Sequence, residues 1–347
     1  MNLSQQSPPD ARHQRVLVTG GAGFIGSHLT EHLLDQGHEV TVVDNFSTGR
    51  RENPGIVRAI AERRARYRVI EGSVSEIVPT LGPGDFDAVY HLAAAVGVRL
   101  VVERPIHTIE TNIHEAGVIL RFAAERALPI LMASTSEVYG KGVRVPMRED
   151  DDVIYGSTGF SRWCYACSKA IDEYLALAYH RESGLPAVVV RFFNTVGPRQ
   201  IGDYGMVLPR FVRAALRGED LEVHGDGRQS RCFCDVRDIV PALPRLLAMK
   251  ECHGRVFNLG RDEPITIGEL AELVIATLRS RSRIRIVPYE RAFAAGFDDL
   301  LVRQPDLTRV REVIQFAPSI PLAQTIRDLA HEIESRAREP LGTGGGA

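Results

Sequence analysis

The stretch Val18–Leu29, VTGGAGFIGSHL, decides how the chain begins to fold. It continues an apolar run over 15–19 that is typical of a buried strand, and it leads into an amphipathic, helix-like stretch over 27–36. Between the two, glycines recur at three-residue spacing, namely Gly20, Gly23 and Gly26. Strand, glycine turn and helix in this order form a dinucleotide-binding fingerprint, because the turn admits a pyrophosphate and the helix N-terminus stabilises its charge.

A second strand pattern ends in an acid where this fingerprint requires one. Residues 39–43 are strand-like, and Asp44 follows the glycine turn by about twenty residues. A carboxylate at this place hydrogen-bonds the adenine ribose hydroxyls and repels the additional phosphate of NADP. NAD is therefore the expected cofactor, and Arg50 and Arg51 leave NADP as the alternative.

The composition is that of an ordinary globular protein. The chain has 347 residues, 44% of them hydrophobic and 25% charged, which suffices for a large core. A net charge of −2 gives no field that would attract nucleic acid or a membrane surface. The apolar runs are shorter than a membrane span, and the polar start of the chain is no signal peptide. We expect a cytoplasmic protein with neither a nucleic-acid partner nor a membrane anchor.

The five cysteines do not form a disulfide framework in a chain of this size. Cys164 and Cys167 make a CxxC pair within a helical pattern, and Cys232 and Cys234 make a CxC pair. Since no histidine pair lies at ligand spacing beside them, we expect reduced thiols and no metal site. A redox or zinc role is the alternative.

Strand-like and helix-like segments alternate along the first half of the chain. The strand-like runs are 16–19, 40–43, 67–70, 88–91, 130–134 and 187–192. The helix-like stretches are 27–36, 53–65, 108–126 and 165–183. This alternation predicts an α/β fold with a doubly wound, parallel Rossmann sheet.

The pattern changes after Asn194, where prolines and shorter elements become frequent. We expect a smaller C-terminal α/β lobe that covers the carboxyl edge of the sheet, because ligands bind at that edge. The expected division is a disordered leader over 1–14, a Rossmann domain over 15–194 with a return segment near 235–262, a substrate lobe over 195–330 and a tail over 331–347.

Tyr165 and Lys169 lie four residues apart in YACSK, so on a helix they share one face. A phenol is a poor base at neutral pH. A lysine ammonium and a positively charged nicotinamide ring nearby would lower its pKa and make it a usable general base. The pair therefore predicts proton abstraction by Tyr165, with ordinary helix packing as the alternative.

Hydroxyl groups follow the fifth expected strand in the segment ASTSEVYG over 133–140. Ser134, Thr135 and Ser136 would lie at the carboxyl end of the strand, where hydroxyls can hydrogen-bond a substrate. We expect them to assist Tyr165 in removing a proton. Capping of the next turn is the other interpretation.

Taken together, these motifs resemble the extended short-chain dehydrogenases/reductases, in the group of nucleotide-sugar epimerases, dehydratases and decarboxylases. The resemblance runs from about Arg15 to Arg327. It is carried by TGGAGFIG at 19–26, DNFSTG at 44–49, HLAA at 91–94, STSEVYG at 134–140, YACSK at 165–169, RFFNTVGPR at 191–199 and GDGRQSRCF at 225–233.

The resemblance implies a set of binding residues. The cofactor would be bound by Gly20, Gly23, Phe24, Ile25, Gly26, Asp44, Asn45, Ser47, Thr48, Gly49, Ala93 and Ala94, with Tyr165 and Lys169. Asn194 would bind the substrate diphosphate, and Arg231 and Arg303 would hold the nucleotide-linked phosphates. The stretch Val207–Phe211 would embrace the base. Ser73 departs from the family pattern, in which an aspartate often contacts adenine.

All members of the group begin alike: hydride leaves the sugar C4 for NAD⁺ while the tyrosine, here Tyr165, removes the hydroxyl proton. Return of hydride to the other face gives a 4-epimerase, which needs no further acid. A 4,6-dehydratase typically carries an Asp-Glu pair, but here the pair is Ser136-Glu137.

The resemblance is closest to the UDP-glucuronate decarboxylases, which share the triplet Thr135-Ser136-Glu137, the arginine at Arg231 and the run Arg162–Tyr165. Glu137 would position a carboxyl group or a water, and Arg162 and Arg231 would offset its charge. The expected function is formation of UDP-xylose from UDP-glucuronate. The alternatives are a UDP-glucose or UDP-glucuronate 4-epimerase and a non-catalytic NAD-binding protein.

The family usually dimerises through two long helices of each subunit. The segments 108–126 and 165–183 are the candidates for these helices in this chain. The resemblance therefore implies a homodimer that acts on a UDP-linked sugar.

Overall fold

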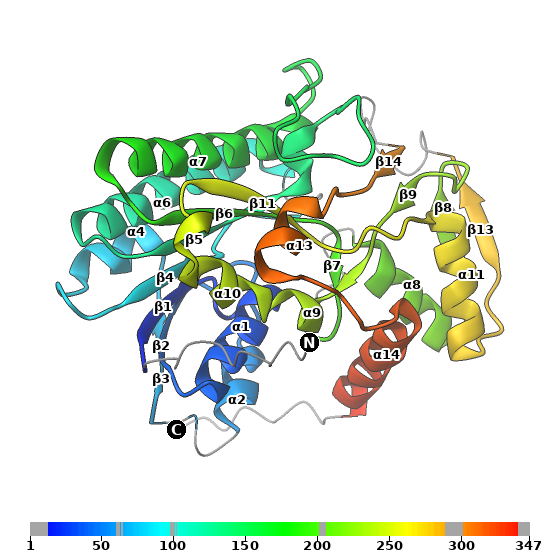
Figure 1. Ribbon diagram of the computed structural model, residues 1–347. Coiled ribbons are helices and arrows are strands. Elements are labelled where there is room, and N and C mark those ends of the chain that lie inside the picture. Colours follow the sequence, from blue (N-terminus) through cyan, green and yellow to red (C-terminus); the bar gives the residue numbers. More distant parts are fainter. Residues whose placement is uncertain are drawn as a thin grey trace, which may run out of the picture.

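A seven-stranded parallel sheet forms the centre of the molecule, with the strand order β11-β6-β5-β4-β1-β2-β3 (Figure 1). The computed structural model describes residues 13–338 except 60–62, 64, 98–100, 102, 201–205 and 289–300. The strands are β1 (Arg15–Thr19), β2 (Glu39–Asp44), β3 (Tyr67–Glu71), β4 (Ala88–His91), β5 (Ile130–Thr135), β6 (Ala187–Phe192) and β11 (Arg255–Leu259). The predicted doubly wound α/β fold is confirmed.

Helices cover both faces of this sheet, as Figure 1 shows. One layer contains α1 (Phe24–Asp35), α2 (Glu52–Arg58), α9 (Val236–Ile239) and α10 (Ala242–Ala248); the other contains α4 (Val74–Ile77), α6 (Pro105–Glu125) and α7 (Arg162–Ser183). Short 3₁₀ turns lie at Val78–Thr80, Ser136–Tyr139 and Lys250–Cys252. Successive residues of β1 enter opposite cores: Val16 and Val18 pack toward α1, whereas Leu17 packs toward α6. Burial on both faces explains why the strands read as nearly continuous apolar runs.

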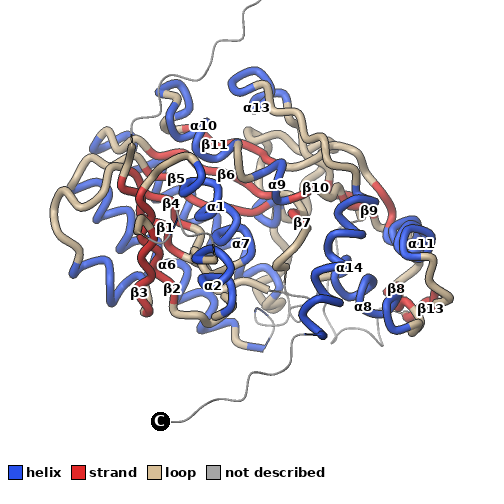
Figure 2. The backbone as a smooth tube through the Cα atoms, turned by 90° about the horizontal axis from the view of Figure 1, so that it is seen from below, coloured by secondary structure: helices blue, strands red, loops and turns tan. Residues whose placement is uncertain are grey.

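The second lobe lies beside the sheet and has its own core (Figure 2). Its helices are α8 (Val207–Arg217), α11 (Ile267–Leu278) and α14 (Leu322–Arg338). Its short strands are β8 (Leu221–His224), β9 (Ser230–Arg231), β12 (Ile265–Thr266), β13 (Ile284–Val287) and β14 (Val302–Arg303). Two further short strands, β7 (Thr195–Val196) and β10 (Cys234–Asp235), pair with each other. Phe211, Leu270 and Leu329 from the three helices meet in this core.

The chain returns to the large sheet within the segment expected near 235–262, where β11 joins the sheet beside β6. The helix α13 (Thr308–Ile314) also packs there, since Val310 and Ile314 belong to the core that contains β1. α14 extends eight residues past the expected end of the lobe at 330, and Ile333 beyond that point still packs against the core of the lobe. Residues 1–12 of the expected leader and 339–347 of the expected tail lie outside the described residues.

Candidate active site

A cavity of about 940 Å³ lies at the carboxyl edge of the sheet, where α1, α7 and the second lobe face one another. This is the edge at which doubly wound sheets bind ligands. Nearly all predicted site residues line the cavity. Gly49 does not, and of the stretch Val207–Phe211 expected beside the base, Val207 and Arg210 do. Those in its wall are Gly20, Gly23, Phe24, Ile25, Gly26, Asp44, Asn45, Ser47, Thr48, Ala93, Ala94, Thr135, Ser136, Glu137, Arg162, Tyr165, Lys169, Asn194, Arg231 and Arg303.

The glycine loop forms one end of the cavity and has no room for side chains. Gly20 has a φ of +74°, and a Cβ atom there would lie 2.6 Å from the backbone nitrogen of Ala93. A Cβ on Gly26 would collide with the carbonyl oxygen of Gly20. Gly23 is the N-cap residue of α1 and makes no side-chain hydrogen bond. No side chain at the N-cap position therefore competes with a phosphate for the backbone N–H groups of the first turn. Such a turn fits a pyrophosphate.

Asp44 ends β2 beside this loop and is 7% exposed. Its two carboxylate oxygens accept hydrogen bonds from the backbone N–H groups of Ala22, at 2.9 Å, and Phe46, at 2.8 Å. Burial raises the pKa of Asp44, while these two hydrogen bonds oppose the rise. A Cβ on Gly49 would lie 3.1 Å from Asp44 Oδ1, so Gly49 lies close beside the carboxylate, although it does not line the cavity. Each oxygen keeps a lone pair for a ribose hydroxyl.

Tyr165 and Lys169 lie on the cavity side of α7, one turn apart, as predicted. Lys169 Nζ forms an ion pair with Asp172 Oδ2 at 2.7 Å. Burial and the negative charges of Glu137 and Asp172 raise the pKa of Tyr165, and a hydrogen bond with Thr135 opposes the rise. The expectation that Lys169 and a nicotinamide ring together lower this pKa concerns the NAD-bound enzyme and stays a prediction.

The three hydroxyls after β5 take different directions. Thr135 hydrogen-bonds Tyr165 and also accepts from the backbone N–H of Glu137 at 3.2 Å. Ser134 instead donates a hydrogen bond to Glu173, so the expectation that the Ser134 hydroxyl assists Tyr165 is wrong. Neighbouring residues of a strand point to opposite faces, which explains why Ser134 and Thr135 differ. Ser136 is buried in the cavity wall.

Glu137 meets several arginines at the other end of the cavity. Its carboxylate lies 2.7 Å from Arg303 Nη1 and 3.6 Å from Arg162 Nη2. Burial would raise the pKa of Glu137, but the charges of Arg303, Arg162 and Arg231 outweigh burial and lower it. Glu137 is therefore ionised, and the surrounding positive charges exceed its single negative charge.

Two of these arginines come from paired strands of the second lobe. β9 and β14 place Arg231 and Arg303 at the same register position. The predicted role of both was to hold nucleotide-linked phosphates. In the structure Arg303 donates to Glu137 and both arginines line the cavity, so their binding of phosphates stays a prediction. Arg303 Nε and Asn194 Oδ1 are buried without hydrogen-bond partners, and both therefore remain able to bind a ligand.

Sequence reasoning missed several residues of the cavity wall. His224 lines it from the second lobe, and its Nε2 lies 2.8 Å from Nη1 of Arg210, a residue of the stretch already expected beside the base. Glu103 and His107 line it from near the start of α6. No motif marks these positions, because the packing of the lobe and of α6 brings them to the cavity.

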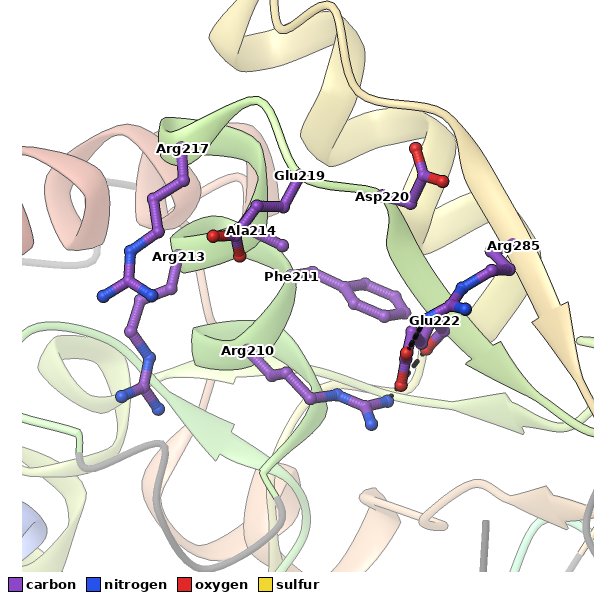
Figure 3. A pocket seen from close by; sticks show the side chains of 9 residues that line it. All are labelled: Arg210, Phe211, Arg213, Ala214, Arg217, Glu219, Asp220, Glu222 and Arg285. Carbon is purple, nitrogen blue, oxygen red and sulfur yellow. Dashed lines mark hydrogen bonds and ion pairs between the residues drawn. The ribbon is translucent and has the colours of Figure 1, made fainter. Parts of the chain in front are cut away.

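A second hollow of about 650 Å³ lies on α8 and β8 (Figure 3). It combines four arginines with three acids, and its wall is Arg210, Phe211, Arg213, Ala214, Arg217, Glu219, Asp220, Glu222 and Arg285. Arg285 pairs with Glu222, and Arg210 donates to the carbonyl of Glu222 at 3.0 Å. The glycine loop and Tyr165 line the larger cavity instead, so the chemistry belongs there.

Other kinds of site leave no trace in the described part of the chain. It contains no group of three or more histidine, cysteine or acidic side chains placed to hold a metal ion. Its five cysteines are all free thiols. None of its helices combines the length and apolar character that crossing a membrane requires.

The fold and the cavity define an α/β enzyme in which a dinucleotide site lies beside the side chain of Tyr165. The chain belongs to the NAD dependent epimerase/dehydratase family, whose sequence profile matches residues 16–260. It is 41% identical to a UDP-N-acetyl-alpha-D-glucosaminuronate decarboxylase of Bacillus cytotoxicus, over 91% of this chain and 96% of that protein. It is 35% identical to UDP-glucuronic acid decarboxylase 1 of Danio rerio, over 97% and 79%.

Solved structures show the same architecture. The UDP-glucuronic acid 4-epimerase of Bacillus cereus, solved with UDP-glucuronic acid and NAD, superposes with a TM-score of 0.81. The two chains are 26% identical, and the match covers 93% of this chain and 99% of that one. NAD is the cofactor, in agreement with the sequence analysis. The side-chain-free glycine loop and the exposed lone pairs of Asp44 fit its pyrophosphate and adenine ribose.

Proposed function

We propose that the enzyme decarboxylates UDP-glucuronate to UDP-xylose through a 4-keto sugar. The observation that supports this most strongly is the cluster of Arg303, Arg162 and Arg231 around the single carboxylate of Glu137. A uronate supplies a second carboxylate, and guanidinium groups bind carboxylates through paired hydrogen bonds.

NAD⁺, when bound along the glycine loop, supplies the hydride acceptor and later returns the hydride. Tyr165 removes the proton of the C4 hydroxyl, and Thr135 holds the phenol by its hydrogen bond. The product of this step is a β-keto acid. It loses CO₂ because the ketone accepts the electrons of the breaking bond. Arg303 and Arg162 orient the carboxylate before that loss, and Glu137 positions a water that delivers the proton to C5.

Two related reactions compete with this proposal. The relative that is 41% identical carries the name of a UDP-N-acetylglucosaminuronate decarboxylase, so that substrate is the second candidate. It differs at the sugar C2 and shares the carboxylate that the arginines recognise. The 4-epimerases share the fold at lower identity, and one that acts on UDP-glucuronate would present the same carboxylate to these arginines, so the products must separate the two reactions.

The test is a comparison of substrates. The enzyme is incubated separately with UDP-glucuronate, UDP-N-acetylglucosaminuronate and UDP-glucose, and the products are identified by mass spectrometry. We expect CO₂ release and a UDP-pentose from UDP-glucuronate, and no conversion of UDP-glucose to UDP-galactose. UDP-galacturonate as the only product would overturn decarboxylation. Release of CO₂ from UDP-N-acetylglucosaminuronate alone would show that this sugar is the substrate, and decarboxylation would remain the reaction.

We also propose a homodimer that forms through α6 and α7. The two helices pack together, and their outer faces carry exposed apolar side chains, Ile106 and Ile109 on α6 and Ile171 and Tyr174 on α7. Ile106 is 71% and Tyr174 65% exposed, which is costly for a lone monomer. Analytical ultracentrifugation of the wild type should give a dimer and of Tyr174→Glu a monomer. A monomeric wild type would contradict this interface.

The proposed location is a reducing cytoplasm. All five cysteines are free thiols, and three of them, Cys232, Cys234 and Cys252, are buried. Fractionation of cells that express the chain, followed by detection of the enzyme in the soluble fraction, tests it.

A further inference from the structure

Arg199 ends the motif at 191–199, yet it does not line the cavity, whereas the next residue, Gln200, does. The backbone of Arg199 has a φ of +67°, in the left-handed region that residues with a Cβ atom adopt only at a cost in free energy. Such a conformation persists where the surrounding structure holds it. The contacts of Arg199 therefore indicate what this end of the motif positions.

Arg199 contacts both lobes of the molecule. Its Nη2 lies 2.7 Å from Oε2 of Glu31 on α1, and its side chain is only 11% exposed. Its backbone N–H donates a hydrogen bond to Glu332 on α14. α1 packs on the large sheet, and α14 contributes Leu329 to the core of the second lobe. Glu31, Arg199 and Glu332 thus join the two lobes, and we call these three residues the interlobe clamp.

The two carboxylates of the interlobe clamp each have a further cation beside them. Glu31 pairs with Arg63, whose side chain is 6% exposed, and Glu332 pairs with Arg336 one turn along α14. Burial would raise the pKa of Glu31, but Arg199 and Arg63 outweigh burial and lower it. Removal of the Arg199 side chain would therefore break the contact between the lobes and leave neither carboxylate without a cation.

The interlobe clamp contacts the segments that form the cofactor end of the cavity. α1 begins at the glycine loop, and Phe24 in its first turn lines the cavity. The segment after β2 contributes Thr48 to the wall, and Arg50, two residues on, donates its backbone N–H to Ala22 of the glycine loop at 3.2 Å. Burial raises the pKa of Glu332, and the charge of Arg50 opposes the rise. The clamp thus joins the second lobe to the segments expected to contact the pyrophosphate and the adenine ribose.

We propose that the interlobe clamp holds the second lobe closed against α1 and thereby slows the release of bound NAD. Because residues of both lobes line the cavity, movement of the second lobe away from α1 would open the cofactor end to solvent. Retention of the cofactor suits the proposed reaction, in which the hydride returns to the sugar. The inference itself rests only on NAD as the cofactor, and it does not depend on which sugar is the substrate.

The test is the rate at which NADH leaves the enzyme in the absence of a sugar. Each protein is loaded with NADH and mixed with an excess of NAD⁺, and release is followed by the change in NADH fluorescence. The variants are Arg199→Gln, Glu31→Gln and the double variant, with Arg15→Gln as the control. Arg15 begins β1 at the sheet edge opposite the cavity and pairs with Asp87 at 2.9 Å, so its loss breaks an ion pair outside the clamp.

We expect Arg199→Gln and Glu31→Gln each to speed NADH release about tenfold, because each breaks the partly buried contact between the two side chains. The double variant should release NADH no faster than the single variants, since all three act through one contact. Arg15→Gln should release NADH at the rate of the wild type. An unchanged rate in Arg199→Gln, or additive effects in the double variant, would overturn the proposal.

Circular dichroism checks that the variants fold. If Arg199→Gln does not fold, Arg199→Lys takes its place, because lysine keeps the charge but not the planar set of donors, and it should speed release about threefold. Release from Arg199→Lys at the rate of the wild type would then refute the clamp. Since no sugar is present, a failure of decarboxylation leaves this result unaffected, and an unchanged release rate leaves the proposed reaction intact.

Discussion

At the cofactor end of the cavity, Gly20 and Asp44 come from neighbouring segments and are placed by backbone contacts. At the substrate end, Glu137 is held by Arg303, which follows it by 166 residues. The first end contains few charges and has a shape fixed by the absence of side chains. The second end is a cluster of charged side chains supplied by both lobes. The comparison indicates that the fold builds cofactor binding locally and substrate recognition by long-range packing.

Tyr165 lies between the two ends, and its removal should have the largest effect. Tyr165→Phe keeps the ring but removes the proton acceptor, so kcat should fall about a thousandfold, within the usual range for a general base. NAD binding, measured by calorimetry, should stay near that of the wild type. Loss of NAD binding together with kcat would show that Tyr165 belongs to the cofactor end.

Arg303→Gln tests the substrate end. It leaves Glu137 without its nearest partner, so kcat/KM for the uronate should fall about a hundredfold. Arg303→Lys should recover part of the loss because it restores the charge without the planar group. The matched control is Arg285→Gln in the outer hollow of Figure 3, which breaks a pair with Glu222 and should leave turnover unchanged. Equal effects of the two glutamine variants would contradict the assignment.

The junction between the lobes should respond to pH through His28. Its Nε2 lies 3.0 Å from the carbonyl of Pro198, and burial and the charge of Arg199 lower its pKa to about 4. The folded state thus favours neutral His28, whereas the unfolded chain binds a proton near pH 6.5. The contribution of His28 to the free energy of unfolding is complete above pH 6.5, and it is lost as the pH falls toward 4.

Denaturant unfolding at pH 7 and at pH 4 measures this loss. Between these two pH values, the free energy of unfolding of the wild type should fall by up to about 3 kcal/mol more than that of His28→Gln. The same loss in both proteins would show that His28 does not couple the lobes to pH.

Gly26→Ala tests the cofactor end with the smallest expected effect. The added Cβ would meet the carbonyl oxygen of Gly20 and lie 2.8 Å from Gly21 Cα, so the loop must shift. We expect the free energy of unfolding to fall by about 1–3 kcal/mol, with weaker NAD binding. Gly55→Ala is the control, since a Cβ there meets no atom within 4 Å. An unchanged NAD affinity in Gly26→Ala would weaken the assigned role of the loop.

The sequence predicts most of the cofactor end because its signals are local. The spacing of Gly20, Gly23 and Gly26 follows from what a pyrophosphate turn needs, and Asp44 follows from the end of the next strand. The four-residue spacing of Tyr165 and Lys169 likewise places both on one side of α7. In each case, secondary structure alone brings the residues together.

The substrate end could be predicted only in part. Arg303 was expected near phosphates. Nothing in the sequence shows that β14 pairs with β9 or that the guanidinium of Arg303 reaches Glu137. Asp172 lies three residues after Lys169, yet its spacing alone does not show that the pair is buried. Ser134 was expected beside Tyr165, but the position of Glu173 determines where its hydroxyl points. Such contacts depend on tertiary packing.

The central claim is that the arginines around Glu137 hold a sugar carboxylate that leaves as CO₂. The most direct measurement is real-time NMR of the wild-type enzyme with UDP-glucuronate labelled with ¹³C at C6. We predict that the label leaves the sugar and appears as CO₂ and bicarbonate, while the resonances of a UDP-pentose grow in step. Retention of the label in a 4-epimerised uronate would contradict the account.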